Sequence, residues 1–141
     1  MRLLLALALT LACAVPAAAQ APAVDIAAVA RLQGEARTRA LVEGARREGE
    51  VMVYHSSQTE DLKPVFDAFT QKYGVKVRDW RSSSENVVQR VISETRAGRR
   101  EVDFVENNSP EMEALSREKM LLRMESPYFA DLRPGDRKSV V

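Results

Sequence analysis

The stretch VMVYHSSQTED, residues 51–61, decides how the rest of the sequence is interpreted. It opens with an apolar run, Val51 to Tyr54, of the length and composition typical of a buried strand. The run ends at the chain's single histidine, His55, and at Ser56 and Ser57. Apolar residues then recur at helical spacing, at Leu62, Val65, Phe66, Phe69 and Tyr73. Because Gly74 is a natural helix end, the stretch predicts a strand that passes through a polar turn into a helix of about four turns.

The same order of elements occurs twice more along the chain. We expect strands at 75–80 and 102–105 and helices at 87–95 and 110–119. Short apolar strands separated by helices favour a parallel sheet with right-handed crossovers. The predicted fold class is therefore α/β, built as a parallel-sheet βαβαβα unit. A helix over 27–48, ended by Gly49, is expected before it, and a short extended segment over 120–124 is expected after it.

A serine stands near the start of each of the three helices that follow a predicted strand. Ser57 and Ser82 are each followed three residues later by a glutamate, Glu60 and Glu85, which is the capping-box pattern. Ser109 precedes Pro110, and proline is common at the first helical position. In a parallel sheet these helix starts lie at one edge, where open α/β sheets bind ligands. Their free backbone N–H groups favour anions or acceptor oxygens, so the sequence predicts a binding site at this edge. The alternative for each serine is a cap without any contact to a ligand.

His55 has three possible roles on sequence grounds. It is a buried structural residue, a contact to a ligand, or a metal or catalytic group. Metal binding would need company from Glu106 or Asp103, at the third strand. Catalysis would need a serine, and the adjacent Ser56 and Ser57 offer poor geometry for a triad.

The bulk composition excludes some classes of protein. The 21 Lys and Arg nearly cancel the 20 Asp and Glu, and no block of like charge occurs, which argues against nucleic-acid binding. The chain contains no glycine-rich phosphate loop, no dinucleotide fingerprint and no nucleophile elbow. We therefore expect a globular protein that is not an enzyme and has no cofactor, no catalytic residue and no protein-bound metal.

The N-terminus has the features of a secretory signal. Arg2 precedes an apolar run, and Ala17 to Ala19 supply small residues for cleavage after Ala19, so residues 1–19 are predicted to be a signal peptide. Cys13 lies inside it, so the mature chain would have no cysteine, which suits the bacterial periplasm. No membrane insertion is expected once the signal is removed. Residues 20–33 are predicted to be a flexible lead-in, 34–132 an α/β domain and 133–141 an irregular tail.

Three segments carry a resemblance to a known family. They are "ARREGEVMVYHSSQTEDLKPVFDAFTQKYGVKV", "RSSSENVVQRVISETRAGRREVDFVENNSPEMEAL" and "LLRMESPY", which together lie within residues 40–132. In these segments the chain resembles the periplasmic solute-binding proteins of bacterial ABC importers, in the iron(III)-type or extracellular solute-binding branch. The resemblance implies a type II fold of two lobes, of which this chain would be the N-terminal lobe, truncated before the second. It also implies ABC importer permease subunits as partners.

The resemblance implies a set of ligand-binding residues, since the family's first lobe contacts its solute through the turns after its first three strands. Matched to this sequence, the residues are His55, Ser56, Ser57, Ser83, Ser84, Asn107, Asn108 and Ser109. The expected solute is a small oxyanion, a carboxylate or a chelated metal. Two alternatives remain open at this point: a truncated gene product without independent function, and an exported hydrolase that uses His55 and a serine.

Overall fold

The computed structural model describes residues 26–123 and 126–132. The predicted signal peptide (1–19), the whole predicted tail (133–141) and part of the predicted lead-in lie outside the described residues. Within them, the chain forms, in order, α1 (Ile26–Arg31), α2 (Gly34–Glu48), β1 (Glu50–His55), α3 (Thr59–Tyr73), β2 (Lys76–Arg81), α4 (Ser84–Arg96), β3 (Phe104–Glu106), α5 (Ser109–Arg117) and a 3₁₀ helix, η1 (Pro127–Asp131).

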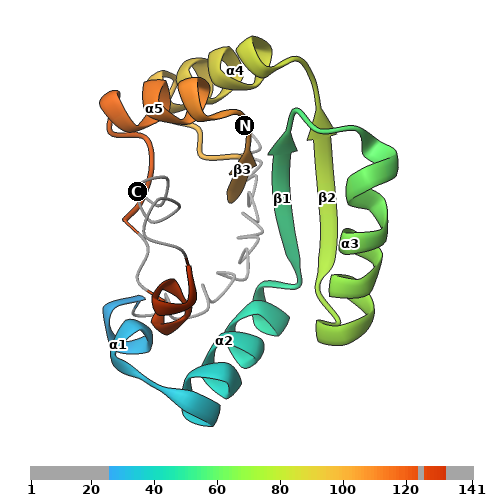
Figure 1. Cartoon of the computed structure of the whole chain (residues 1–141), viewed down its shortest axis with the longest axis vertical. Coiled ribbons are helices and arrows are strands. Elements are labelled where there is room, and N and C mark those ends of the chain that lie inside the picture. Colours follow the sequence, from blue (N-terminus) through green and yellow to red (C-terminus); the bar gives the residue numbers. More distant parts are fainter. Residues whose placement is uncertain (1–25, 124–125, 133–141) are drawn as a thin grey trace, which may run out of the picture.

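The three strands form one open parallel sheet in the order β2-β1-β3. Figure 1 shows β1 between its two neighbours, with α3 beside β2 and with α4 and α5 together. This arrangement confirms the predicted α/β fold with its βαβαβα order. The chain moves from β1 outward to β2 and then crosses back to β3 on the other side. The strand order therefore reverses between β1 and β3, which places the topological switch point of the sheet there.

Alternation along β1 sends its last two side chains to opposite faces. Tyr54 points to the face covered by α4 and α5, where the buried core consists of Tyr54, Val87, Val88, Val91 and Leu115. His55 points to the other face, and its ring meets the edge of Phe66 from α3 at 5.8 Å between centroids. Burial of the apolar side chains on both sides of β1 holds this strand in place, and with it the turn that follows.

A polar network closes the core beside Tyr54. The Tyr54 hydroxyl donates to the Glu94 carboxylate at 3.0 Å, and the Arg90 Nε donates to the same carboxylate at 2.8 Å. The Arg90 guanidinium also lies over the rings of Tyr54 and Trp80, at 4.5 and 4.3 Å from their centroids. Glu94 is only 7% exposed, so its charge depends on these partners.

Burial raises the pKa of the Tyr54 phenol above its usual value of 10.0, and the hydrogen bond to Glu94 adds to the rise. Because the folded state then holds the phenolic proton more tightly than the unfolded chain, the stabilisation is complete below about pH 10 and is lost as the pH rises further. We expect the free energy of unfolding, measured by urea denaturation, to fall as the pH rises above about 10. Tyr54→Phe should flatten that fall, while Tyr128→Phe, at an exposed residue, should not. An equally steep fall in Tyr54→Phe would contradict the assignment.

The structure corrects the helix predicted over 27–48. Two helices, α1 and α2, replace it, and they are separated at Leu32 and Gln33. The N–H of Leu32 closes the end of α1 on the carbonyl of Val29, and Gly34 takes a left-handed conformation with φ of 54°. This positive φ interrupts the helix at Gly34. The helical spacing of the apolar residues continues before and after the break, so the sequence pattern alone did not show it. The predicted ends at Gly49 and Gly74 are confirmed, because both residues cap a helix in the left-handed conformation.

The third strand is shorter than predicted and begins two residues later. Asp103 explains the difference, because its Oδ2 accepts the N–H of Met52 at 2.8 Å while its own N–H donates to the Met52 carbonyl at 3.0 Å. The carboxylate thus takes the place of a ladder carbonyl, and regular pairing starts only at Phe104. The extended segment expected over 120–124 is not a strand in residues 120–123, and Met124 lies outside the described residues.

Candidate functional site

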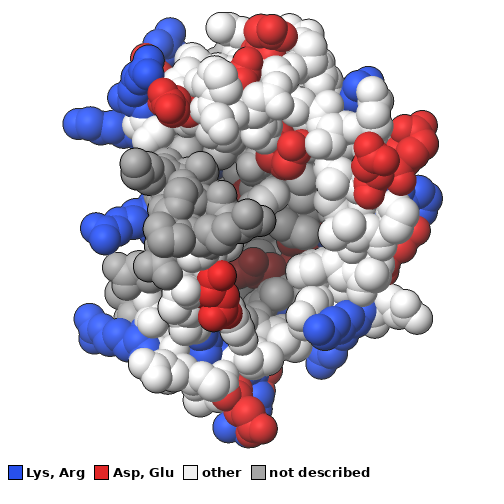
Figure 2. Space-filling model, viewed as in Figure 1, with Lys and Arg blue, Asp and Glu red and all other residues white. Residues whose placement is uncertain are grey.

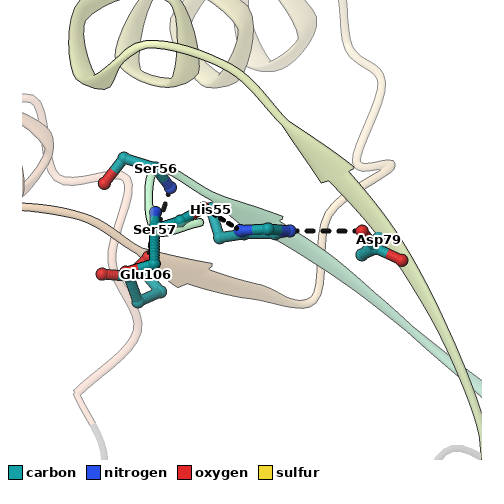
Figure 3. A network of polar contacts seen from close by, with 5 residues as sticks. All are labelled: His55, Ser56, Ser57, Asp79 and Glu106. Atoms are coloured by element: carbon teal, nitrogen blue, oxygen red, sulfur yellow. Dashed lines mark hydrogen bonds and ion pairs between the residues drawn. The ribbon is translucent and has the colours of Figure 1, made fainter. Parts of the chain in front are cut away.

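The turns after β1 and β3 flank the switch point and are joined directly. The backbone N–H groups of Ser56 and Ser57 both donate to Oε2 of Glu106, at 3.2 and 3.1 Å. Figure 3 shows the two amides facing this carboxylate, which comes from the last residue of β3. Glu106 is the register partner of His55, so the β1–β3 pairing brings the carboxylate to the turn. Two convergent N–H groups on a single carboxylate oxygen make an anion-binding turn that an internal carboxylate already occupies.

The His55 ring supports this turn from inside. It is fully buried, its Nδ1 lies 3.1 Å from the Ser57 carbonyl oxygen, and its Nε2 lies 3.2 Å from Oδ2 of Asp79 on β2. Both neighbours are acceptors, and a neutral imidazole has only one N–H, so both hydrogen bonds form when the ring carries two protons. His55 thereby ties the Ser57 backbone to β2, as Figure 3 shows. The imidazole ring therefore supports the turn through its hydrogen bonds to the protein, and it is not exposed to solvent.

This geometry does not favour a hydrolase. A triad needs a serine hydroxyl on one ring nitrogen of the histidine and a carboxylate on the other. Asp79 supplies the carboxylate, but the partner on the opposite nitrogen is the carbonyl oxygen of Ser57 and not a hydroxyl.

The two acids considered as metal partners of His55 are engaged elsewhere. Glu106 accepts the turn amides, and Asp103 accepts the N–H of Met52. Among the described residues, no group of three or more His, Cys, Asp or Glu side chains could hold a metal ion.

The second turn joins the other two. The N–H of Ser82 donates to the carbonyl of His55 at 3.1 Å, which links it to the first turn. The side-chain amides of Asn107 and Asn108 donate to the carbonyl and the hydroxyl of Ser84, at 2.9 and 2.8 Å, which link it to the third. All three polar turns therefore form one continuous edge, as the parallel topology required.

Each predicted cap is displaced by one residue. The N-cap of α3 is Gln58 instead of Ser57, that of α4 is Ser83 instead of Ser82, and that of α5 is Asn108 instead of Ser109. Only Ser83 makes a side-chain cap bond, accepting the N–H of Asn86 at 3.4 Å. Tertiary contacts explain the shift in the first turn, because the Ser57 amide and carbonyl bind Glu106 and His55 and so are not available for a capping box.

The predicted site residues differ in how open they are to solvent. His55 is buried, Ser56, Ser57, Ser84 and Asn107 are half-buried, and Ser83, Asn108 and Ser109 are exposed. The structure brings Ser56 and Ser57 to one point, at Glu106, and Ser84, Asn107 and Asn108 to another. No contact joins Ser109 to the other predicted residues in the described part of the chain.

Three residues of this edge were missing from the predicted set: Asp79, Arg81 and Glu106. Each ends or nearly ends a strand, and alternation places Asp79 and Arg81 on the same face of β2. That pattern was visible in the sequence. The proximity of Asp79 and Arg81 to His55 was not visible, because it follows from the strand order and register. Glu106 was predicted only as a possible metal partner of His55.

A pocket of about 230 Å³ opens between α4 and α5, close to the same edge. It is lined by Glu85, Val88, Gln89, Pro110, Glu111 and Ala114. One carboxylate oxygen of Glu111 is buried there without a hydrogen-bond partner. None of the predicted ligand-binding residues lines this pocket.

The charges of the described residues are mixed in sign. On the face shown in Figure 2, acidic and basic side chains are interspersed, and neither forms a continuous patch. Among the described residues, no helix has both the length and the apolar character needed to span a membrane. No protein-family model matches the chain, and no curated protein matches it with significance.

Proposed function

We propose that this chain is the N-terminal lobe of an exported, periplasmic solute-binding component of an ABC importer, and that it binds a small carboxylate or oxyanion at the Ser56–Ser57 amides. Its partners are then the solute and the permease subunits of the importer, and it carries out no chemical reaction. The observation that carries the proposal is the contact between these amides and Glu106, since the turn holds a carboxylate oxygen at hydrogen-bonding distance.

Two further features support the same site. It lies beside the switch point of a parallel sheet, where open α/β folds bind ligands. It also lies in the turns that the resemblance to solute-binding proteins implies. A chelated metal fits less well, because Glu106 and Asp103 already have hydrogen-bond partners and no metal-ligand cluster occurs in the described part of the chain.

The proposal predicts that Glu106 competes with the ligand. Glu106→Ala removes the carboxylate from both amides; the Ser57 N–H is then free, and the Ser56 N–H keeps its bond to the backbone carbonyl of residue 106 at 3.3 Å. We expect inorganic phosphate or citrate to bind at least about tenfold more tightly than to the unchanged chain, because hydrogen bonds to charged groups contribute about 1.5–3 kcal/mol. The measurement is an NMR titration that follows the Ser56 and Ser57 amide signals. Glu106→Gln keeps an acceptor on the amides and should fall between the two.

Glu113→Ala is the matched control, because it removes one negative charge from an exposed ion pair with Arg117 on α5. It should leave the affinity of both anions unchanged. If Glu106→Ala remains folded and neither anion shifts the Ser56 and Ser57 signals in a saturable way, the proposed site is wrong.

The alternative of a product without independent function has one specific observation in its favour. Phe104, on the edge strand β3, is 58% exposed, and Val65 on α3 is 60% exposed. Exposed apolar side chains at an open strand edge favour association. A cooperative thermal transition at monomer mass would exclude this alternative.

A further inference from the structure

We propose that Arg81 is the residue that pairs with the ligand's negative charge, an inference that rests on the proposed function. Arg81 is the last residue of β2 and is exposed. The β1–β2 register places it directly beside His55, the residue before the Ser56–Ser57 turn. Register partners in a parallel sheet share a face and neighbouring strands are about 4.8 Å apart, a gap that an arginine side chain spans. Arg81 thus stands one strand from the turn, while Glu106 stands on the opposite neighbour of β1, so an anion on the amides would meet the Arg81 guanidinium across the end of β1.

The Arg81 side chain has none of the protein partners that about half of the described arginines have. Six arginines of the described residues contact an acceptor on the protein: Arg37 with the Val29 carbonyl, Arg46 with the Tyr73 carbonyl, Arg78 with Glu50, Arg90 with Glu94, Arg96 with Glu118 and Arg117 with Glu113. The side chain of Arg81 makes no hydrogen bond, ion pair or ring contact with the described residues. Its five N–H donors are therefore available to a ligand.

Arg81 is also the single Lys or Arg in the three segments that form this edge, residues 55–61, 79–85 and 104–111. The acidic side chains in these segments each have a favourable contact within the protein. Four stand in the first turns of helices, where the helix dipole favours negative charge: Glu60, Asp61, Glu85 and Glu111. Asp79 bonds to His55, and Glu106 bonds to the turn amides. Arg81 is thus the one cationic side chain among six acidic ones in these segments, and it is the one formal positive charge that they offer to a ligand.

This arrangement defines the chemical class of the ligand. One acceptor oxygen would replace Oε2 of Glu106 on the Ser56 and Ser57 amides, and a second would accept from the Arg81 guanidinium. Carboxylates and phosphates match the planar fork of a guanidinium, whereas halides and single-acceptor neutral solutes do not. The ligand is thus a small anion with at least two acceptor oxygens.

The test compares Arg81→Ala with Lys76→Ala, both in the Glu106→Ala background. Lys76 lies on the same strand at its opposite end, so the two changes remove equal charge from β2 and only one is at the site. We expect Arg81→Ala to weaken the binding of inorganic phosphate and citrate about tenfold, as the loss of a hydrogen bond to a charged group implies, and Lys76→Ala to leave it unchanged. Arg81→Lys should recover part of the loss, because it restores the charge without the fork.

Each outcome of this comparison decides one point. If Arg81→Ala and Lys76→Ala weaken anion binding equally, the effect comes from the overall positive charge of β2 and not from a contact to Arg81. The inference is then overturned. If neither changes the affinity while the Ser56 and Ser57 signals still respond to the anions, the inference fails and the proposed function stands. If the Glu106→Ala background itself shows no response, the proposed function fails first.

Discussion

Tyr54→Ala should remove a large part of the protein's free energy of unfolding. The Tyr54 side chain is fully buried and packs edge to face against Trp80, with the two ring centroids 5.2 Å apart, and against the core on α4 and α5. Truncating a buried aromatic residue costs about 3–5 kcal/mol, and a domain of this size has a free energy of unfolding of only about 5–15 kcal/mol. Urea denaturation followed by circular dichroism measures the loss.

Two variants separate the contributions to this effect. Tyr54→Phe keeps the ring and removes only the hydroxyl that donates to Glu94, so we expect a loss of about 1 kcal/mol. Tyr128→Ala makes the same truncation at a side chain in η1 that is 69% exposed, and it should change the free energy of unfolding by less than about 0.5 kcal/mol. If Tyr54→Ala cost no more than Tyr128→Ala, the core described for this sheet would be wrong.

Arg90→Ala is expected to destabilise the protein by about 3 kcal/mol, because it leaves the nearly buried Glu94 carboxylate without its cationic partner. It also removes the guanidinium from the faces of Tyr54 and Trp80. The hydrogen bond to Glu94 raises the pKa of Arg90, which keeps this cation charged in the folded state. Thermal or urea unfolding measures the effect.

Arg96→Ala is the matched control on the same helix. Arg96 pairs with Glu118 in an ion pair whose side chains are 68% and 48% exposed, so its loss should cost less than about 1 kcal/mol. The double variant Arg90→Met with Glu94→Gln should recover more than half of the loss, because glutamine still accepts from Tyr54 and no buried charge remains unpaired. If the double variant were as unstable as Arg90→Ala, the lost packing of the arginine, and not the stranded carboxylate, would be the cause.

The two networks around β1 have different consequences. Tyr54, Arg90 and Glu94 lie on the core face and stabilise the fold. His55 and Asp79 lie on the other face and hold the turn that carries the proposed anion site. Adjacent residues of one strand therefore serve stability and the site separately, because alternation sends Tyr54 and His55 in opposite directions.

The sequence by itself determined the α/β class and the order of the elements. Both depend on local patterns: the apolar run Val51–Tyr54, the helical spacing of residues 62–73 and the glycines at 49 and 74. Such patterns act within a single element, so they are legible without knowing what the element packs against. They also placed Ser56 and Ser57 at the carboxyl edge of the sheet, because in a parallel sheet every strand-to-helix turn lies there.

Tertiary structure alone decided the chemistry of that edge. Ser56 and Glu106 are 50 positions apart, and only the β2-β1-β3 order with its register brings the carboxylate onto the turn amides. The same contact withdrew Ser57 from the helix cap that its local sequence favoured. Each of these polar groups could form hydrogen bonds of similar strength with several partners, so the local sequence alone does not select one of them. Packing of β1 against its neighbours selects among them, because it fixes which groups are close enough to bond.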